Sequence, residues 1–393
     1  MATYEVYATS WSDPHIVETL LPARELSFSM PLSDHGECTF SATVEPGKSF
    51  WRQSVSPPLS GILIARDGVP CWSGWITADR QVPGTRTFQF TAREWGLFFA
   101  TTPARVRRYD GWTDQSIIRD LIDYAQAQPG QNVHVDTGPW VGGNTSLVEI
   151  NAWDDLDSEA VLRRIAEAEG GPEWYFGTAG ELMDPKRVLV LGTKLGQTTP
   201  VDTLMYVEDT EDWAPPSVPG VAGITLLSNL FPVATIVAPT GRRGGNVLAM
   251  GRTRDTARST TVARAVGAGV EAASLQRSAQ ASKLLAAGWP RMTRWFEHNS
   301  VTDEGMLQRH ANADLAASAG IATGYSLVSL DGDPDWTQVP RGSVMRIVLD
   351  TDVYAGPRPY TFDSRLLGVK VDVPDDGGTA QVQWDVAERL EVD

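Results

Sequence analysis

The histidines come nearest to a metal site in this 393-residue chain. His134 lies two residues before Asp136, and His310 lies four residues before Asp314. Residues two apart share one face of a strand, and residues four apart share one face of a helix. Each pair supplies at most two ligands, and no CxxC, HExxH or HxH motif completes a zinc site. We therefore expect no metal and no cofactor, and we assign these side chains solvated or packing roles.

The two cysteines, Cys38 and Cys71, lie in segments with strand-like composition. Adjacent strands can bring two thiols together, but two cysteines do not make the disulfide framework of a small secreted domain. We predict two buried free thiols, which is the usual state of strand cysteines.

Motifs for nucleophilic or phosphate chemistry are absent from the sequence, which has neither a GxSxG elbow nor a P-loop. The glycine-rich stretch 241–246 leads into a strand rather than a helix N-terminus, so we interpret it as a hairpin tip. Acidic runs at 154–157 and 331–333 contain carboxylate pairs of the kind that glycosidases use, but such pairs are too common in acidic sequences to indicate that activity. Solvated loops or Asx turns explain them better. The sequence predicts no catalytic residue and no enzyme.

The charge of the chain argues against a nucleic-acid-binding function. The formal net charge is −16 and the pI is about 4.8, whereas nucleic-acid binding depends on neutralisation of phosphates by Lys and Arg. The 14 tryptophans are the one aromatic excess. Exposed tryptophans can stack on sugars or anchor a protein interface, but most of these lie in strands or at element ends, so we predict core or intersubunit packing.

Length and hydropathy indicate a soluble chain of roughly two to four domains of about 100 to 150 residues. No window approaches the roughly 18 consecutive apolar residues that span a bilayer. The N-terminal residues lack the basic start and apolar core of a signal peptide, so we expect no secretion by that route.

A β-meander is predicted around Asp67-Gly68, a dipeptide that favours a tight hairpin turn. Phe88 and Phe90 then alternate with polar residues, as in a half-buried strand. With further strand patterns upstream, residues 1–108 are predicted to form a first β-barrel, completed by strands within 225–255.

The pattern changes to α/β over residues 109–200. Thr113 can cap a helix with a 3.6-residue apolar period, and Asp157 or Ser158 can cap a second one. Strand-like pieces lie between and after these helices. We predict an α/β insertion, and we expect the aromatic segment 95–99 to be the place where the first barrel closes on it.

The remaining chain returns to β character. Residues 201–256 are predicted to be a proline-rich connector with returning barrel strands, and residues 257–320 an Ala-rich helical segment in which Asp303 caps a helix. Valines alternate with polar residues near the C-terminus, so residues 321–393 are predicted to supply strands of a second β-barrel. The predicted fold class is β-rich α+β, with two small antiparallel β-barrels carrying α/β and helical insertions.

Taken in order, these segments resemble the tail hub, or tail-tip minor tail, proteins of siphophages, in particular the Gp37-like group, which is related in fold to the baseplate hub of contractile-tail phages. The resemblance is carried by LSGILIARDGVPCWSGWI with FQFTAREWGLFF, YDGW with IIRDLIDYA, VLRRIAEAEGGPEWYF, and RGSVMRIVLD with SRLLGVKVDVPDDGGTAQVQW. The sequence departs from the resemblance at 213–220 and 257–290.

The resemblance implies a virion structural protein that forms a homotrimeric hub ring. Three chains with two barrels each would present six similar elements, so the ring could connect the sixfold tail tube to the threefold tip and gate DNA passage. The implied partners are the distal tail protein, the tape-measure protein and the tip or fibre proteins of the same virion. Genomic DNA would be passing cargo, without sequence-specific recognition. The implied location is the virion tail tip, after assembly in the host bacterial cytoplasm.

Two other classes of function remain open from the sequence. One is a tail-associated receptor- or glycan-binding protein, for which exposed tryptophans would be suited. The other is a tail-associated peptidoglycan hydrolase, against which the absence of a nucleophile or metal constellation in the sequence weighs.

Overall fold

The computed structural model describes residues 2–18, 21, 23–43, 55, 59–138, 142–145, 147–152, 154–207, 245–255, 259–269, 274–299, 301–319, 321–350, 359–375 and 377–391. The predicted proline-rich connector at 215–220 and residues 241–244 of the predicted hairpin tip lie outside them. Within the described residues, no helix is both long and apolar enough to cross a membrane.

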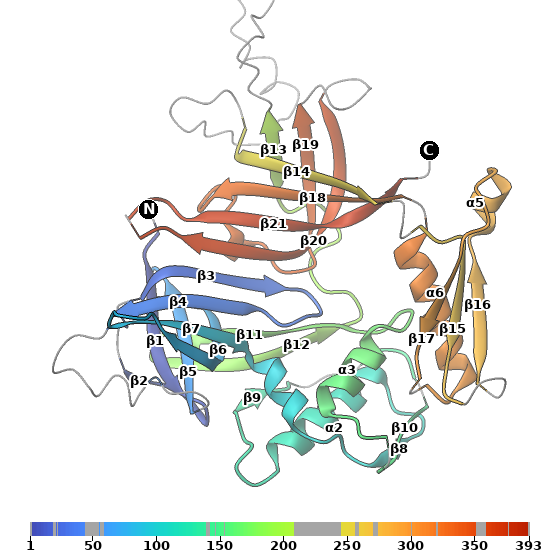
Figure 1. The fold of residues 1–393 in the computed structure, drawn as a ribbon, viewed down its shortest axis with the longest axis horizontal. Coiled ribbons are helices and arrows are strands. Elements are labelled where there is room, and N and C mark those ends of the chain that lie inside the picture. The colour runs from blue at the N-terminus through green and yellow to red at the C-terminus, as the bar shows by residue number, and fades with distance from the viewer. Residues whose placement is uncertain are drawn as a thin grey trace, which may run out of the picture.

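Thirteen strands form one continuous sheet (Figure 1). We call seven of them the N-terminal strands: β1 (Tyr4–Ser10), β2 (Asp13–Glu18), β3 (Ala23–Pro31), β4 (Glu37–Thr43), β5 (Ser60–Arg66), β6 (Val69–Gln81) and β7 (Thr87–Glu94). We call the other six the C-terminal strands: β13 (Thr203–Val207), β14 (Val247–Asp255), β18 (Ile321–Leu330), β19 (Val344–Asp350), β20 (Tyr360–Val373) and β21 (Gln381–Glu391). The two sets meet where β20 pairs antiparallel with β3.

The predicted β-rich α+β class agrees with this architecture, but two separate small barrels are not confirmed. The strand order is β19-β13-β14-β18-β21-β20-β3-β4-β7-β6-β5-β1-β2, so both sets belong to one sheet. β19 also pairs with β20. Strand pairing among the C-terminal strands can therefore be followed from β19 through β13, β14, β18, β21 and β20 back to β19. From the sequence we expected strands within 225–255 to complete the first barrel. The strand described there, β14, pairs with β13 and β18 instead of with the N-terminal strands.

The predicted meander is present as β5, β6 and β7, paired antiparallel in that order. Asp67 and Gly68 have φ of 52° and 77°, the left-handed values that a two-residue hairpin turn with the twist of its strands requires. The aromatic segment that follows is a 3-10 helix, η1 (Trp95–Thr101). Its Trp95 and Phe99 belong to the core of the α/β insertion, which confirms the expected contact between the meander and that insertion.

A single hydrophobic core runs through both sets of strands. It contains Phe28 and Trp72 from the N-terminal strands together with Val371 and Trp384 from the C-terminal strands. Trp72 Nε1 donates to the carbonyl of Ser29 at 3.0 Å, and Trp384 Nε1 donates to Ser329 Oγ at 2.8 Å. Each indole can therefore be buried without losing its hydrogen bond. Because side chains of both sets pack into this one core, its burial stabilises the two sets together.

The α/β insertion lies below the sheet in Figure 1 and forms a second core. It comprises β8 (Arg107–Tyr109), α2 (Asp114–Gln126), β9 (Val135–Asp136), β10 (Val148–Ile150), α3 (Ser158–Ala166), β11 (Glu173–Glu181) and β12 (Asp184–Gly192). The predicted caps are confirmed, since Thr113 accepts a hydrogen bond from the N–H of Ser116, and Asp157 accepts one from the N–H of Ala160.

The segment predicted to be Ala-rich and helical is mainly a small sheet. It comprises β15 (Val262–Val266), β16 (Gln276–Gln280), α5 (Ser282–Ala286), β17 (Thr293–Glu297) and α6 (Glu304–Ser318). The Asp303 cap of α6 is confirmed. Within the segment predicted to be helical, Leu284 and Ala286 do lie in a helix, α5, whereas Leu275 and Ala279 do not, because Leu275 precedes strand β16 and Ala279 belongs to it. Ala263 and Ala265 of β15 are fully buried in a sheet against which α6 packs, so the small side chains serve close helix–sheet approach, and tertiary packing overrides alanine's helix propensity.

A buried arginine in β12 holds the insertion against the N-terminal strands. Arg187 is 2% exposed and donates to the carbonyls of Ser10, Trp11 and Val133 at 2.6–2.7 Å and to that of Asp13 at 3.1 Å. Its guanidinium carbon lies 3.5 Å from the centroid of the Trp95 ring. Burial lowers the pKa of Arg187 to about 9, so the charge is held by main-chain dipoles and an aromatic face.

The Arg187→Met variant tests this role. Four buried carbonyls would lose their donor, so we expect the free energy of unfolding to fall by about 3 kcal/mol or more, measured by urea denaturation. Arg187→Lys keeps the charge but not the planar fork of donors, and should lose part of that amount. The matched control is Arg86→Met at an exposed turn position, expected to change stability by less than about 0.5 kcal/mol. Equal denaturation midpoints for the two Met variants would contradict the role of Arg187.

Candidate functional site

The first histidine pair weighed in the sequence lies on the protein surface. His134 and Asp136 are exposed and line a shallow hollow of about 450 Å3 beside α2. Asp136 accepts a hydrogen bond from the N–H of Gly138 at 2.8 Å, as in an Asx turn. Among the described residues, no group of three or more His, Cys, Asp or Glu side chains is placed to hold a metal ion.

The second pair is rearranged in the structure. Asp314 Oδ2 lies 2.9 Å from Nε2 of His298 rather than bonding to His310, and the rings of His298 and His310 stack with centroids 4.2 Å apart. His310 is 1% exposed, and neither of its ring nitrogens has a hydrogen-bond partner. Burial lowers the pKa of His310 to about 3, and the neighbouring His298 and Arg164 contribute in the same direction. His310 is therefore a neutral packing residue of α6.

Both cysteines are free thiols, as predicted. Cys38 is buried and Cys71 is half-buried. Burial raises the pKa of both thiols, that of Cys71 to about 12. A thiol that is protonated at neutral pH is a poor nucleophile and a poor metal ligand, so this pair has a packing role.

The acidic runs differ from each other. Asp154 accepts a hydrogen bond from the N–H of Asn151 at 2.7 Å, and Asp157 caps α3, so the first run forms the local turns that we expected. The interpretation of Asp331 as part of a solvated loop or Asx turn is wrong. Its side chain is 1% exposed and ion-paired to Arg66 of β5.

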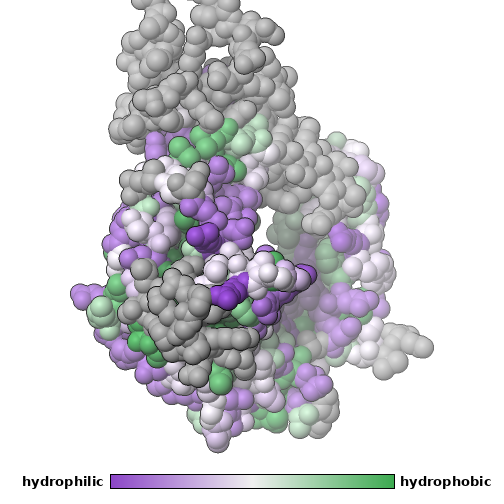
Figure 2. All heavy atoms as spheres, turned by 60° about the vertical axis from the view of Figure 1, so that its left-hand side comes forward, coloured by the Kyte–Doolittle hydropathy of each residue, from purple (hydrophilic) through white to green (hydrophobic). Residues whose placement is uncertain are grey.

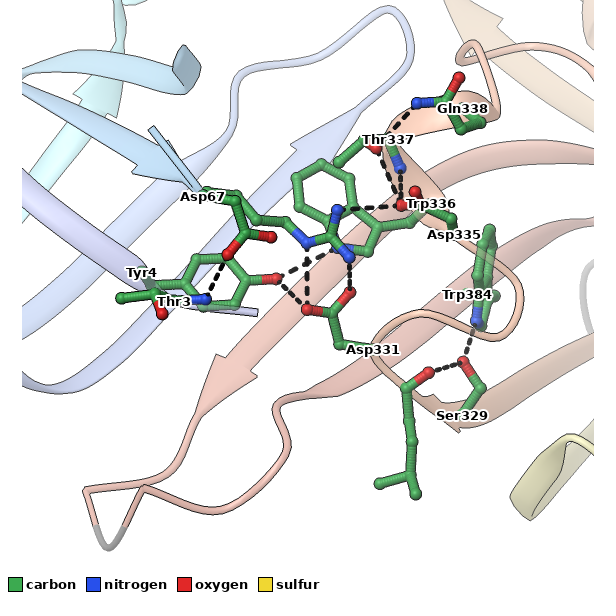
Figure 3. A network of polar contacts seen from close by, with 12 residues as sticks. Thr3, Tyr4, Asp67, Ser329, Asp331, Asp335, Trp336, Thr337, Gln338 and Trp384 are labelled. Carbon is green, nitrogen blue, oxygen red and sulfur yellow. Dashed lines mark hydrogen bonds and ion pairs between the residues drawn. The ribbon is translucent and has the colours of Figure 1, made fainter. Parts of the chain in front are cut away.

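Asp331 is the centre of a polar network that joins the two sets of strands (Figure 3). Arg66 donates to both carboxylate oxygens of Asp331, at 3.0 and 3.1 Å, and lies 3.2 Å from Asp335. Tyr4 of β1 donates to Asp331 at 2.8 Å and accepts from Trp336 Nε1 at 3.3 Å. Burial and the Asp331 carboxylate raise the pKa of Tyr4. The arrangement can lock β1 and β5 onto the loop after β18, and it presents no free nucleophile.

A second junction joins three parts of the chain. Glu94, at the end of β7, is 2% exposed, accepts from the N–H of Gly36 at 2.8 Å and pairs with Arg341 at 3.0 Å. Arg341 comes from the loop before β19, donates to the carbonyl of Pro31 at 3.1 Å, and stacks 4.4 Å from the ring centroid of Tyr175 in β11. Burial raises the pKa of Glu94, and Arg341 opposes that shift.

A third contact ties the C-terminal strands to the insertion, where Arg365 of β20 forms an ion pair with Glu173 of β11. On the face that Figure 2 shows, the described hydrophobic residues lie in small groups among hydrophilic ones. The charged groups described at these junctions therefore have a structural role, because each ion pair joins separate parts of the chain.

Sequence reasoning missed Asp331 because its partner lies 265 residues away, and no local pattern reports such a pair.

A double-mutant cycle tests the Arg66–Asp331 junction. Arg66→Met should lower the free energy of unfolding by about 3 kcal/mol, since it leaves the buried Asp331 carboxylate without its ion-pair partner. Asp331→Asn should lower it by less, because Arg66 keeps Asp335 at 3.2 Å. The double variant should lose less than the sum, with a coupling of about 1 to 3 kcal/mol. The exposed Arg346–Asp363 pair, 42% and 43% exposed, is the matched control, expected to couple by less than about 1 kcal/mol. Equal coupling in the two cycles would contradict the junction.

His310 predicts acid sensitivity with a defined sign. Its pKa in the folded protein, about 3, lies below its ordinary value of about 6.5, so the unfolded chain binds the proton more readily. Stability should therefore be lost as pH falls from about 6.5 towards 3, by up to about 2 kcal/mol at pH 5. His310→Leu should remove this part of the pH dependence of the unfolding midpoint. His134→Asn, at an exposed position, should leave the pH dependence of the unfolding midpoint unchanged. Identical pH profiles for wild type and His310→Leu would exclude His310 as a source of acid sensitivity.

Comparison with protein-family models finds no match to this chain, and comparison with curated proteins finds none either. Solved structures do match. A tail protein from Neisseria meningitidis MC58 aligns with a TM-score of 0.56 and 14% identity, covering 98% of this chain and 96% of that one. The 43 kDa tail protein of prophage MuSo2 from Shewanella oneidensis aligns with a TM-score of 0.56 and 9% identity, covering 98% of both chains.

The prophage tail protein gp18 from Listeria monocytogenes EGD-e aligns with a TM-score of 0.50 and 10% identity, covering 97% of this chain and 94% of that one. At these identities the likeness concerns the fold, and it extends over nearly the whole length of each protein. This chain therefore has a fold similar to that of phage tail proteins.

Proposed function

We propose that this protein is a structural component of a bacteriophage tail tip and forms a hub ring of three identical chains. The observation that carries the proposal is the structural likeness to tail proteins over 98% of the chain. Because the likeness includes both sets of strands and the insertions between them, it concerns the whole architecture rather than one common domain. The siphophage hub resemblance of the sequence points to the same role.

In the proposed ring, the N-terminal strands and the C-terminal strands would take the places of the two small barrels that the sequence resemblance implies. Their shared core and their β3–β20 pairing would keep them in one orientation. Three chains then present six similar β elements, so a threefold tip can dock on a sixfold tail tube. The buried junctions at Asp331 and Glu94 suit a part that must resist force without changing shape.

The proposed location is the tail tip of the virion, reached after assembly in the host bacterial cytoplasm. The proposed partners are the distal tail protein, the tape-measure protein and the tip or fibre proteins. Genomic DNA is cargo that the ring gates. With a net charge of −16 per chain, acidic residues lining the lumen would let DNA slide without adhering, and a neutral or basic lumen in an electron-microscopy reconstruction would contradict this.

The full-length chain provides the test of this function. Light scattering should give a mass about three times 42.7 kDa, either alone or with its distal tail partner, and averaged particle images should show threefold symmetry. Antibodies against the chain should label the tail tip of virions. Labelling along fibres with glycan-array binding would instead indicate a receptor-binding protein, and clearing of host cell walls in a zymogram would indicate a hydrolase.

A further inference from the structure

We propose that residues 259–319 form a unit that separates from the α/β insertion in acid, and that protonation of His310 releases it. This unit, which we call the small unit, contains β15, β16, α5, β17 and α6. It opens as one body while the large sheet stays folded, so the acid sensitivity of His310 is local before it is global. The opening does not depend on how many chains form the proposed ring.

The small unit joins the rest of the chain at one place. It is inserted between β14, which ends at Asp255, and β18, which begins at Ile321. These two strands pair antiparallel with Asp255 opposite Ala322, so the unit leaves and re-enters the large sheet at neighbouring positions, and it stands to the right of that sheet in Figure 1. Backbone rotation at two adjacent connections can therefore move the unit without breaking a strand pairing of the large sheet.

The contact that holds the small unit in place lies between α6 and the insertion. Arg309 donates to the carbonyl of Glu169 at 2.9 Å and to the carboxylate of Asp114 at 3.1 Å. The N–H of Glu169 donates to the carbonyl of Arg309 at 3.2 Å, and Asn312 donates to the Glu169 carboxylate at 2.6 Å. Ala311 of α6 belongs to the same hydrophobic cluster as the core of the insertion. The small unit is therefore held by polar bonds and apolar packing along one stretch of one helix.

His310 lies within this stretch, between Arg309 and Ala311, in a form that has no place for a second proton. It is 1% exposed, and neither of its ring nitrogens has a hydrogen-bond partner among the described residues. Its ring stacks on that of His298, whose Nε2 already lies 2.9 Å from Asp314. Protonation would place an unpaired charge and an unsatisfied N–H donor in a dry site, which is unfavourable. Opening places the ring in water, where the proton is accepted without that cost.

The sign of the pH dependence follows from the neighbours of His310. Burial lowers its pKa in the closed form to about 3, below the ordinary value of about 6.5. Three neighbours add to this shift: His298, Arg164 of α3 and Arg309. The open form therefore binds the proton more readily. Each pH unit below about 6.5 should favour opening about tenfold, until the pH approaches 3.

Glu167, just after α3, acts in the opposite direction. Desolvation raises its pKa in the closed form, Arg163 and His298 oppose that shift, and Asp314 adds to it. A carboxyl group with a raised pKa binds its proton more readily in the closed form, so acid favours closing at this residue. The shift of Glu167 is the smaller of the two. His310 therefore decides the sign between about pH 6.5 and pH 5.

Hydrogen exchange on the full-length chain, followed by mass spectrometry of overlapping peptides, tests this opening. The reporter is the N–H of Glu169, which bonds to the carbonyl of Arg309 across the contact. After correction for the intrinsic exchange rate at each pH, its protection should fall about 30-fold between about pH 7.5 and pH 5. Protection within β18 and β21 should stay far higher at both pH values, because these strands exchange only when the large sheet opens.

Variants of His310 identify the group that titrates. His310→Leu should reduce the change in protection at Glu169 to less than about threefold. If that variant does not fold, His310→Gln provides the same test, because an amide is polar but does not titrate. The matched control is His134→Asn at an exposed position of the insertion, which should keep the 30-fold fall of wild type.

Two results would overturn the local opening. One is exchange of the Glu169 N–H as slow as that within β18 and β21, since the small unit would then open only when the whole chain unfolds. The other is an unchanged pH dependence in the His310 variants. A chain that never forms trimers would contradict the proposed ring and leave this opening in place, because the exchange of Glu169 reports on a contact within one chain.

Discussion

One largely buried guanidinium, that of Arg341, contacts all three main parts of the fold. It belongs to the C-terminal half of the chain, pairs with Glu94 and the carbonyl of Pro31 in the N-terminal half, and stacks on Tyr175 of the insertion. Removing these charges from water costs several kcal/mol for each ion, which the pair recovers only in a good geometry. An apolar contact tolerates sliding of one surface over another, whereas this junction is favourable in one orientation.

The apolar core and the ionic junctions have different consequences. The shared core makes the two sets of strands cohere, because Phe28 and Val371 lie in the same cluster. The junctions at Asp331, Glu94 and Glu173 then hold the relative positions of the loops and the insertion at points where no strand pairing does so. In the proposed ring both properties would matter, since a small rotation within each chain would accumulate around the ring and prevent closure.

The features that sequence analysis predicts correctly are those whose determinants lie within a few residues. Thr113, Asp157 and Asp303 are helix caps because the oxygen that accepts and the N–H that donates are three residues apart. The Asp67-Gly68 turn is similarly local. Asp331 and Arg187 have partners more than 170 residues away in sequence, so no local pattern reports them. The Ala-rich segment is predicted to be helical because alanine has a high helix propensity. In the fold, Ala263 and Ala265 instead lie in a strand, where small side chains let α6 pack closely against the sheet.

The predominance of arginine over lysine has a physical use in this fold. Only five of the 33 basic residues are lysines, and arginines occupy the junctions at Arg66, Arg187, Arg341 and Arg365. A planar guanidinium offers five donors in a rigid fork and an apolar face, so one side chain can satisfy a carboxylate, a carbonyl and an aromatic ring together. Lysine offers a single strongly hydrated centre that would leave part of each buried site unsatisfied. The chain can thus hold positive charge at its internal junctions, and at the β15–β17 sheet the guanidinium of Arg264 lies over the ring of Trp295 in the same way.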